Sequence, residues 1–458
     1  MAKRILWIFA GLMVSACGLV ESSSEPVVLN GSPAEYSLPG GSGAPGALWY
    51  ESFGDLRLET LILAAQKNNL EARQALARIV QARALVTGAR SERLPSLDLQ
   101  GSLSQEWEDG DRQETHRRAG ASLSWEIDLF NRLGAEYSAQ RHEERASKDD
   151  LEAVRLSLSA EIARSYFTSV AQHRQLSLLQ EQIQSDRSLL DLIRKREAAG
   201  IGTNVEVLQQ KSQLADNQSL IPLEEAALRL SENRLDVLLA EPPDGKDRTF
   251  PQDSLPTVSG IPATGVPSDL LLNRPDLRAM KSRLVAQDAQ IEAAIAETLP
   301  RISLSGSFAL VDGAVTGSPV SSLLGSLVQP LLDWGKHQAE VKRNKALYEE
   351  KLAAFTQAYL IAIEEVENTL YQENRQREYL KRLDARRDLL AQTLDAAQAV
   401  YKQGESDYMP VLTAVRDLRA VERSMVRAQL DLVLLRIALF KALGGSKIND
   451  RDHLQERE

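Results

Sequence analysis

The chain is poor in the residue types that build catalytic and metal centres. It has one cysteine, Cys17, five histidines and 5% aromatic residues among its 458 positions. A single cysteine excludes a disulfide within one chain, and the histidines show no paired metal-ligand spacing. The sequence has no Walker motif and no glycine-rich phosphate loop. Its net charge is −10, and no basic patch suggests a nucleic acid. We therefore expect no enzymatic activity, no metal, no cofactor and no nucleic acid partner.

Glycine and proline are absent from two very long segments, Lys336 to Gln403 and Ala135 to Ala199. Apolar residues recur along both at spacings of three and four, which is typical of a helix packed lengthwise on other helices. At about 1.5 Å per residue, each helix would be on the order of 100 Å long. A globular domain of ordinary size does not bury such a helix.

Each long segment ends in a short turn, and a second apolar helix begins directly after it. The first turn covers residues 200–204 and the second covers residues 403–408. Gly200 and Gly404 are about 204 positions apart, and a Leu-Pro pair at residues 94–95 recurs at residues 299–300. A repeat of this length indicates that a whole module was duplicated. The sequence therefore predicts a mainly α protein with two long helical hairpins.

The apolar period changes from 3.6 to 2 within residues 95–130 and 300–333, which predicts one β-hairpin in each repeat. Apolar residues such as Leu123 and Leu304 alternate there with a polar set: Ser122, Ser124, Glu126, Ser303 and Ser305. Strands of about ten residues with one apolar face suit a transmembrane β-barrel whose polar set faces the lumen. The same alternation suits a soluble, half-buried sheet, so alternation alone leaves both open.

The number of strands favours the barrel. Four strands cannot close a barrel, and lipid does not tolerate the unpaired edges of an open sheet. Small barrels need about eight strands. Three chains with four strands each would supply twelve, and cyclic symmetry is the usual route to such an assembly. We expect a homotrimer.

The N-terminus has the features of an export signal. Residues 1–16 combine two basic residues with an apolar run that is too short to span a bilayer. Val14-Ser15-Ala16-Cys17 matches a bacterial lipobox, in which Cys17 becomes the lipidated first residue of the mature protein. Gly18 follows in place of aspartate, as in lipoproteins sent to the outer membrane. The alternative is a signal peptide with an incidental cysteine.

The remaining boundaries follow from composition. Residues 17–50 are rich in Ser, Gly and Pro and are expected to be a tether. The first repeat covers residues 51–241, a proline-rich linker covers 242–266, the second repeat covers 267–445, and a polar tail covers 446–458.

Two stretches carry a family resemblance. Asn273-Arg274-Pro275-Asp276-Leu277 and Leu299-Pro300-Arg301-Ile302-Ser303-Leu304 resemble outer membrane factors of the TolC type. The closest branch is the lipoprotein branch with OprM and NodT-like proteins. Each motif alone is weak, but the lipobox, the order of elements and the repeat extend the resemblance over nearly the whole mature chain.

The resemblance implies a homotrimer in the outer membrane, with a twelve-stranded barrel that continues as a helical tunnel across the periplasm. Such a channel passively conducts substrates that an inner-membrane pump, here of the RND type, delivers through a periplasmic adaptor (membrane fusion) protein. The resemblance assigns adaptor contact to eight turn residues: Gly200, Ile201, Gly202, Thr203, Gly404, Glu405, Ser406 and Asp407.

Two positions depart from the family pattern. In many relatives aspartates follow the second turn and ring the closed lower end, whereas this chain has Pro410 and Thr413. Family hairpins often end in Leu-Gly before the linker, whereas this chain has Leu239-Ala240. Met409 and Thr413 are four residues apart and share one helical face. The resemblance places the periplasmic gate at this face, so we expect these two residues to form it.

The competing interpretation is a lipid-anchored periplasmic coiled coil with a structural or adaptor role. It explains the hairpins and Cys17, but it does not explain the four amphipathic strands. The sequence favours the channel.

Overall fold

The computed structural model describes residues 33–38, 40, 48–108, 111–250, 254–258, 260–312 and 320–445. The predicted signal peptide, Cys17, most of the tether and the polar tail lie outside these residues. Their assignments therefore stay predictions.

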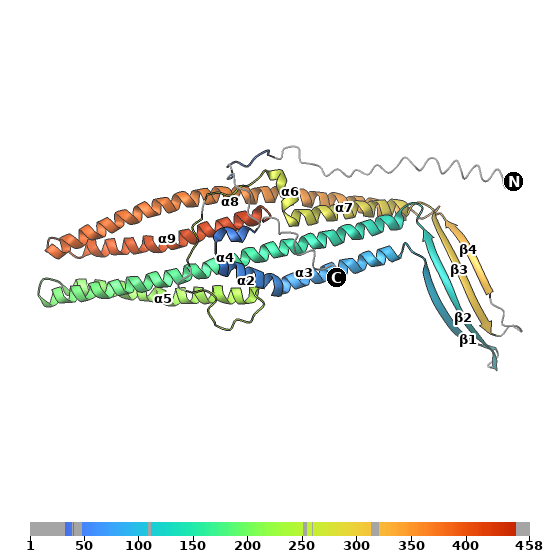
Figure 1. Ribbon diagram of the computed structural model, residues 1–458, viewed down its shortest axis with the longest axis horizontal. Coiled ribbons are helices and arrows are strands. Elements are labelled where there is room, and N and C mark those ends of the chain that lie inside the picture. Colours follow the sequence, from blue (N-terminus) through green and yellow to red (C-terminus); the bar gives the residue numbers. More distant parts are fainter. Residues whose placement is uncertain are drawn as a thin grey trace. The chain divides into compact units, whose positions relative to one another are not determined.

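The described elements form two series in the same order, one for each repeat (Figure 1). The first series is η1 (Trp49–Phe53), α2 (Leu56–Asn68), α3 (Leu70–Ser91), β1 (Ser96–Glu108), β2 (Asp111–Ile127), α4 (Arg132–Ala198) and α5 (Asn204–Leu238). The second series is η2 (Pro267–Asp269), α6 (Leu270–Asn273), α7 (Pro275–Ala296), β3 (Arg301–Asp312), β4 (Val320–Val328), α8 (Lys336–Gln403) and α9 (Met409–Ala442).

The two longest helices follow the segments that lack glycine and proline. Helix α8 has 68 residues and the bounds of its segment, and α4 has 67 residues. Helix α4 begins before its segment, because the Asp128 carboxylate accepts a hydrogen bond from the Gly134 amide in the first turn, at 2.7 Å. Among the residues that the structure describes, no helix has an apolar stretch long enough to cross a membrane.

The four strands form one antiparallel sheet in the order β1-β2-β3-β4. The register places Leu123 opposite Leu97 and Gly306, and it places Ser124 opposite Ser96 and Ser305. Because side chains alternate between faces, the five predicted polar residues share one face of the sheet. Hydrogen bonds between serine hydroxyls join neighbouring strands on that face: Ser96 with Ser124 at 2.8 Å, Ser303 with Ser326 at 3.2 Å, and Ser307 with Ser322 at 2.8 Å.

The fourth strand begins and ends earlier than the sequence pattern indicated. The apolar stretch from Leu323 to Leu332 predicts one strand, but β4 ends at Val328. Pro330 lacks an amide hydrogen for a strand ladder, so the pairing stops ahead of it. Leu331 and Leu332 lie beyond the sheet.

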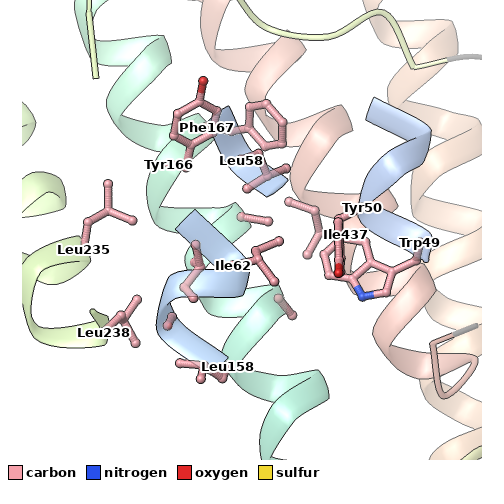
Figure 2. Close-up of a cluster of buried hydrophobic side chains, with 14 of the residues drawn as sticks. Trp49, Tyr50, Leu58, Ile62, Leu158, Tyr166, Phe167, Leu235, Leu238 and Ile437 are labelled. Carbon is pink, nitrogen blue, oxygen red and sulfur yellow. The ribbon is translucent and has the colours of Figure 1, made fainter. Parts of the chain in front are cut away.

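The chain divides into two compact units. One contains the sheet and comprises Ala75–Asp150 and Asp276–Ala358, and the other includes Leu151–Pro275 and the residues from Tyr359 onward. Figure 2 shows the main core of the second unit, where side chains from η1, α2, α4, α5 and α9 meet. Asp55 caps α2 by accepting from the Arg57 and Leu58 amides, and it also accepts from the Tyr166 hydroxyl at 2.8 Å.

The proline-rich linker is held to the second unit at two places. Near its start, the Arg248 amide donates to the fully buried Glu232 at 3.1 Å, and the Arg248 side chain pairs with Asp236. Further on, Arg377 donates to the carbonyl of Val258 at 3.2 Å, and Arg436 donates to that of Gly260 at 2.9 Å.

Candidate functional site at the hairpin turns

The two hairpin turns have the same backbone geometry. Gly200 and Gly404 adopt φ angles of 74° and 81°. The amide of Ile201 donates to Arg196 at 3.1 Å, and the amide of Glu405 donates to Val400 at 3.2 Å. This pattern is the Schellman motif, in which glycine takes the left-handed position without strain. Chain reversal alone therefore explains the two glycines.

The turns present mostly polar groups to the surroundings. Ile201 is 64% exposed and is the large apolar side chain of the first turn. Thr203 caps α5, because its Oγ1 accepts from the Glu206 amide at 3.4 Å. Glu405 and Asp407 are exposed, whereas Gly202 and Ser406 are half-buried.

Met409 and Thr413 lie on the exposed face of the first turns of α9, as their spacing indicated. Met409 is 49% exposed, and its Sδ accepts a hydrogen bond from Gln209 Nε2 of α5 at 3.3 Å. The opposite face of α9 packs Val411 and Val415 against a cluster with Ile193 of α4. The described single chain leaves the Met409–Thr413 face without an apolar cover.

A buried polar network lies next to these turns. Asp186 of α4 is fully buried, and its carboxylate accepts from Gln210 at 3.0 Å and from Asn217 at 2.7 Å, both on α5. Arg419 of α9, also buried, donates to the same carboxylate. The network therefore ties the first hairpin to the second.

Two tyrosines extend the network to the turn. The Tyr401 hydroxyl donates to Glu206 at 2.8 Å, and the Tyr408 hydroxyl donates to Gln210. Their ring centroids are 5.6 Å apart, and the Arg196 guanidinium lies 4.5 Å above the Tyr401 ring. Burial, together with Glu206, raises the pKa of Tyr401 to about 12, and burial also raises the pKa of Tyr408. Both hydroxyls thus stay protonated donors at neutral pH.

One residue of the sequence indicates this network, although the apolar pattern alone did not predict it. The apolar seam of α4 runs through Leu179, Ile183, Leu190 and Ile193, and the position between the two middle members is Asp186. A charged residue at a seam position is costly to bury unless partners surround it. The seam alone did not identify Arg419 as that partner, because Arg419 lies 233 positions away.

Comparison with known proteins identifies the family. The family described as outer membrane efflux protein matches residues 61–241 and 266–445, one segment in each repeat and together most of the chain. The chain belongs to this family. It is an outer membrane efflux channel, and the periplasmic coiled-coil interpretation is not favoured.

Individual members of the outer membrane efflux family match over nearly their whole length. The pyoverdine export outer membrane protein OpmQ of Pseudomonas putida is 29% identical over 90% of this chain and 92% of its own. Nodulation protein T of Rhizobium leguminosarum bv. trifolii is 29% identical over 95% and 96%. The solved outer-membrane channel OprN has a TM-score of 0.83 and 25% identity, over 91% of this chain and 97% of its own.

Proposed function

We propose that the chain assembles as a homotrimer and conducts substrates passively from a periplasmic adaptor to the cell exterior. The observation that carries this proposal is the open sheet with one apolar and one hydroxyl-rich face. Among the described strands, β1 and β4 form its two edges. Edge groups need partners in lipid, so β4 of one copy would pair with β1 of the next. Three copies then close a twelve-stranded barrel around the serine face.

The helices offer a second line of support. Exposed apolar residues follow one face of α5, including Leu208, Leu223 and Leu230, and α8 exposes Tyr379 and Leu389. Helix α5 runs away from its turn and α8 runs toward its turn, so α5 and α8 of neighbouring copies would pack antiparallel. Leu230 and Tyr379 both lie about 40 Å from their turns at 1.5 Å per residue, which puts them at one level.

Cysteine cross-linking tests the assembly. Cys17 is the only native cysteine, so the paired substitutions Leu230→Cys and Tyr379→Cys in a Cys17→Ser background report one contact. Oxidation in membranes should yield covalent dimers and trimers. Leu230→Cys alone is the matched control and should stay monomeric on denaturing gels. A double variant that never exceeds the monomer in size would contradict the trimer with this contact.

Adaptor contact is proposed for the eight turn residues. Six of them are exposed, which supports this role, although chain reversal alone explains Gly200 and Gly404. A bulky residue at Gly202 would not separate the two explanations, because its Cβ would lie 3.1 Å from the Glu197 amide nitrogen. Ile201→Asp is a cleaner variant, since this side chain is 64% exposed.

Ile201→Asp should lower export severalfold and leave the amount of channel in the outer membrane unchanged. Leu63→Asp, at an exposed leucine of α2 outside the proposed α5–α8 contact, is the control for a general effect of added charge. A cysteine at Ser406 should cross-link to the adaptor. Equal export by Ile201→Asp and the parent, without a cross-link from position 406, would place the adaptor elsewhere.

The remaining parts of the proposal concern anchoring and energy. We propose that Cys17 carries lipid in the outer membrane, which mass spectrometry of the mature N-terminus would detect as an acylated cysteine. The channel itself would catalyse no reaction, and an RND-type inner-membrane pump would supply the energy and select the cargo. Pairing the channel with a second compatible adaptor and pump should change which compounds are exported. Cargo that stays the same after the exchange would show that the channel selects it.

A further inference from the structure

Three large apolar side chains stand almost fully exposed where the sheet meets the helices. Leu331 is 91% exposed, Leu332 is 73% exposed and Trp334 is 90% exposed. They lie between the end of β4 and the start of α8, and together they are termed the junction patch. Single exposed apolar residues are ordinary, but three within four positions mark an interaction surface.

The backbone holds Trp334 in this position at a cost. Its φ angle is 56°, in the left-handed region that costs a residue with a side chain roughly 1–2 kcal/mol. The turn around it is fixed by Asp333, whose carboxylate accepts from the Gly335 amide at 3.0 Å and the His337 amide at 2.9 Å. These bonds, with that from the His337 ring, lower the pKa of Asp333 to about 2, so the cap stays ionised. Glycine would adopt this backbone without strain, and the chain has tryptophan instead.

The first repeat builds its junction in the same way. Asn131 has a φ angle of 60°, and Asp128 caps α4 by accepting from the Leu133 and Gly134 amides. Ile127 and Leu129 are exposed there. The arrangement therefore belongs to the duplicated module and is not an accident of one loop.

Cations lie at the same end of the sheet as the junction patch. Lys336 lies two positions after Trp334 and is exposed. Arg301, at the start of β3, is partly exposed and pairs with Glu297 at 3.1 Å. Arg93 precedes β1 and lies over the Tyr137 ring at 5.4 Å. Apolar side chains next to cations match the region where lipid acyl chains meet headgroup phosphates, and tryptophan is enriched at that depth.

We propose that the junction patch inserts into the periplasmic surface of the outer membrane, with Trp334 at the boundary between headgroups and acyl chains. The proposal rests on the outer membrane placement of the sheet. Continuity selects lipid over a second copy of the chain: the patch directly follows β4, whose residues Leu323 and Leu327 are exposed on the apolar face. Lipid that covers this face would also contact the patch. Its headgroup phosphates would pair with the Lys336 ammonium group.

Fluorescence quenching in proteoliposomes tests the occupant. The difference in emission between the parent and Trp334→Phe isolates Trp334, and the difference for Trp125→Phe isolates a tryptophan on the apolar face of β2. Phospholipids brominated near the headgroup end of the acyl chain should quench Trp334 at least twofold more than phospholipids brominated deep in the chain. Trp49→Phe, in the buried core of the second unit, is the control and should show no difference.

The outcomes separate this proposal from the proposed function. Quenching of Trp125 without quenching of Trp334 would contradict insertion of the junction patch into lipid. It would leave the proposed barrel unaffected. No lipid quenching of either would overturn the membrane placement of the sheet itself. Trp334 that is quenched by aqueous acrylamide but not by bromolipid faces water, and protection from both quenchers means that protein covers it. Both results reject lipid as the occupant.

A second variant uses the strained backbone. Trp334→Gly relieves the left-handed conformation, so thermal stability in detergent should be equal to or above that of the parent. The same variant should reconstitute into liposomes at least twofold less efficiently, because the anchor is lost. Asn131→Gly relieves a similar backbone without removing an apolar side chain, and it should reconstitute like the parent. Parent-like reconstitution of Trp334→Gly would reject the anchor.

Discussion

Asp186 and Arg419 form an ion pair that is almost completely removed from solvent, with 0% and 7% of their side chains exposed. The pair joins α4 of the first repeat to α9 of the second, beside the turns assigned to the adaptor. Burying two charges is costly, and the net gain over an apolar pair is small. Removing either partner lowers the free energy of unfolding, because the other charge then stays buried without a partner.

The first prediction is that Asp186→Asn loosens the closed channel. Removing one partner of a buried ion pair costs about 3–5 kcal/mol. We expect a lower unfolding temperature by circular dichroism and a severalfold higher basal conductance in planar bilayers. Asp191→Asn is the matched control, because Asp191 pairs with Lys195 at the exposed surface, where a pair contributes about 0.3–0.5 kcal/mol. Equal conductance of Asp186→Asn and the parent would mean that the network does not hold the channel closed.

The second prediction concerns Tyr401, whose hydroxyl donates to Glu206. Its pKa of about 12 lies above the ordinary tyrosine value of about 10, so folding favours the protonated form. The stabilisation is complete below pH 10 and is lost as pH rises toward 12. The tyrosinate absorbance difference between the parent and Tyr401→Phe should therefore titrate near pH 12. A difference that titrates near pH 10 would show that Tyr401 is in water.

The long helices and the strands could be predicted from the sequence, because they depend on local pattern. The absence of glycine and proline determines α8, and period-two alternation determines the faces of the sheet. The network around Asp186 could not be predicted, since it depends on how α4 packs against α9. The end of β4 was misplaced, because an apolar run such as Leu323 to Leu332 does not distinguish a strand from an exposed turn.

Ala240 gives the third prediction. The sequence shows it only as a departure from a Leu-Gly ending, but the structure places it in a Schellman turn with a φ angle of 60°. Its counterpart in the second repeat is Gly444, with a φ angle of 89°. Ala240→Gly should relieve left-handed strain and stabilise the protein by up to about 1 kcal/mol, the unfolded-state entropy of glycine offsetting part of the gain.

The reverse change provides the comparison for Ala240→Gly. Gly444→Ala should destabilise the chain by more than 1 kcal/mol, since a Cβ there would lie 2.6 Å from the Asn273 carbonyl oxygen. Thermal unfolding in detergent measures both variants. A drop in unfolding temperature for Ala240→Gly would mean that the alanine methyl group makes a contact worth more than the strain.

The fourth prediction tests the two faces of the sheet. Leu123→Arg should impair assembly, because a charge on the lipid face costs about 2–4 kcal/mol near the midplane. Ser124→Arg, the neighbouring residue on the hydroxyl face, is the matched control and should assemble, with at most an altered conductance. The same contrast holds for Leu304→Arg and Ser303→Arg. Failure of the serine variants together with assembly of the leucine variants would reverse the inside and outside of the barrel.

The fifth prediction concerns the gate. Met409 and Thr413 share the exposed face at the start of α9, and three copies around an axis would form a methionine ring and a threonine ring. Neither side chain titrates near neutral pH, so closure would depend on apolar contact rather than on an acidic ring. The nearest acids on this turn, Glu405 and Asp407, are exposed.

Met409→Ala should therefore raise the basal leak, because the apolar ring widens. Thr413→Asp should create a block by divalent cations from the periplasmic side that the parent lacks, since three carboxylates would face one another. Thr413→Asn has nearly the same size without charge and should stay insensitive. Conductance in planar bilayers with cations added to one side measures all three variants. A parent channel already blocked by micromolar multivalent cations from that side would place an acidic ring elsewhere and reject Met409 and Thr413 as the gate.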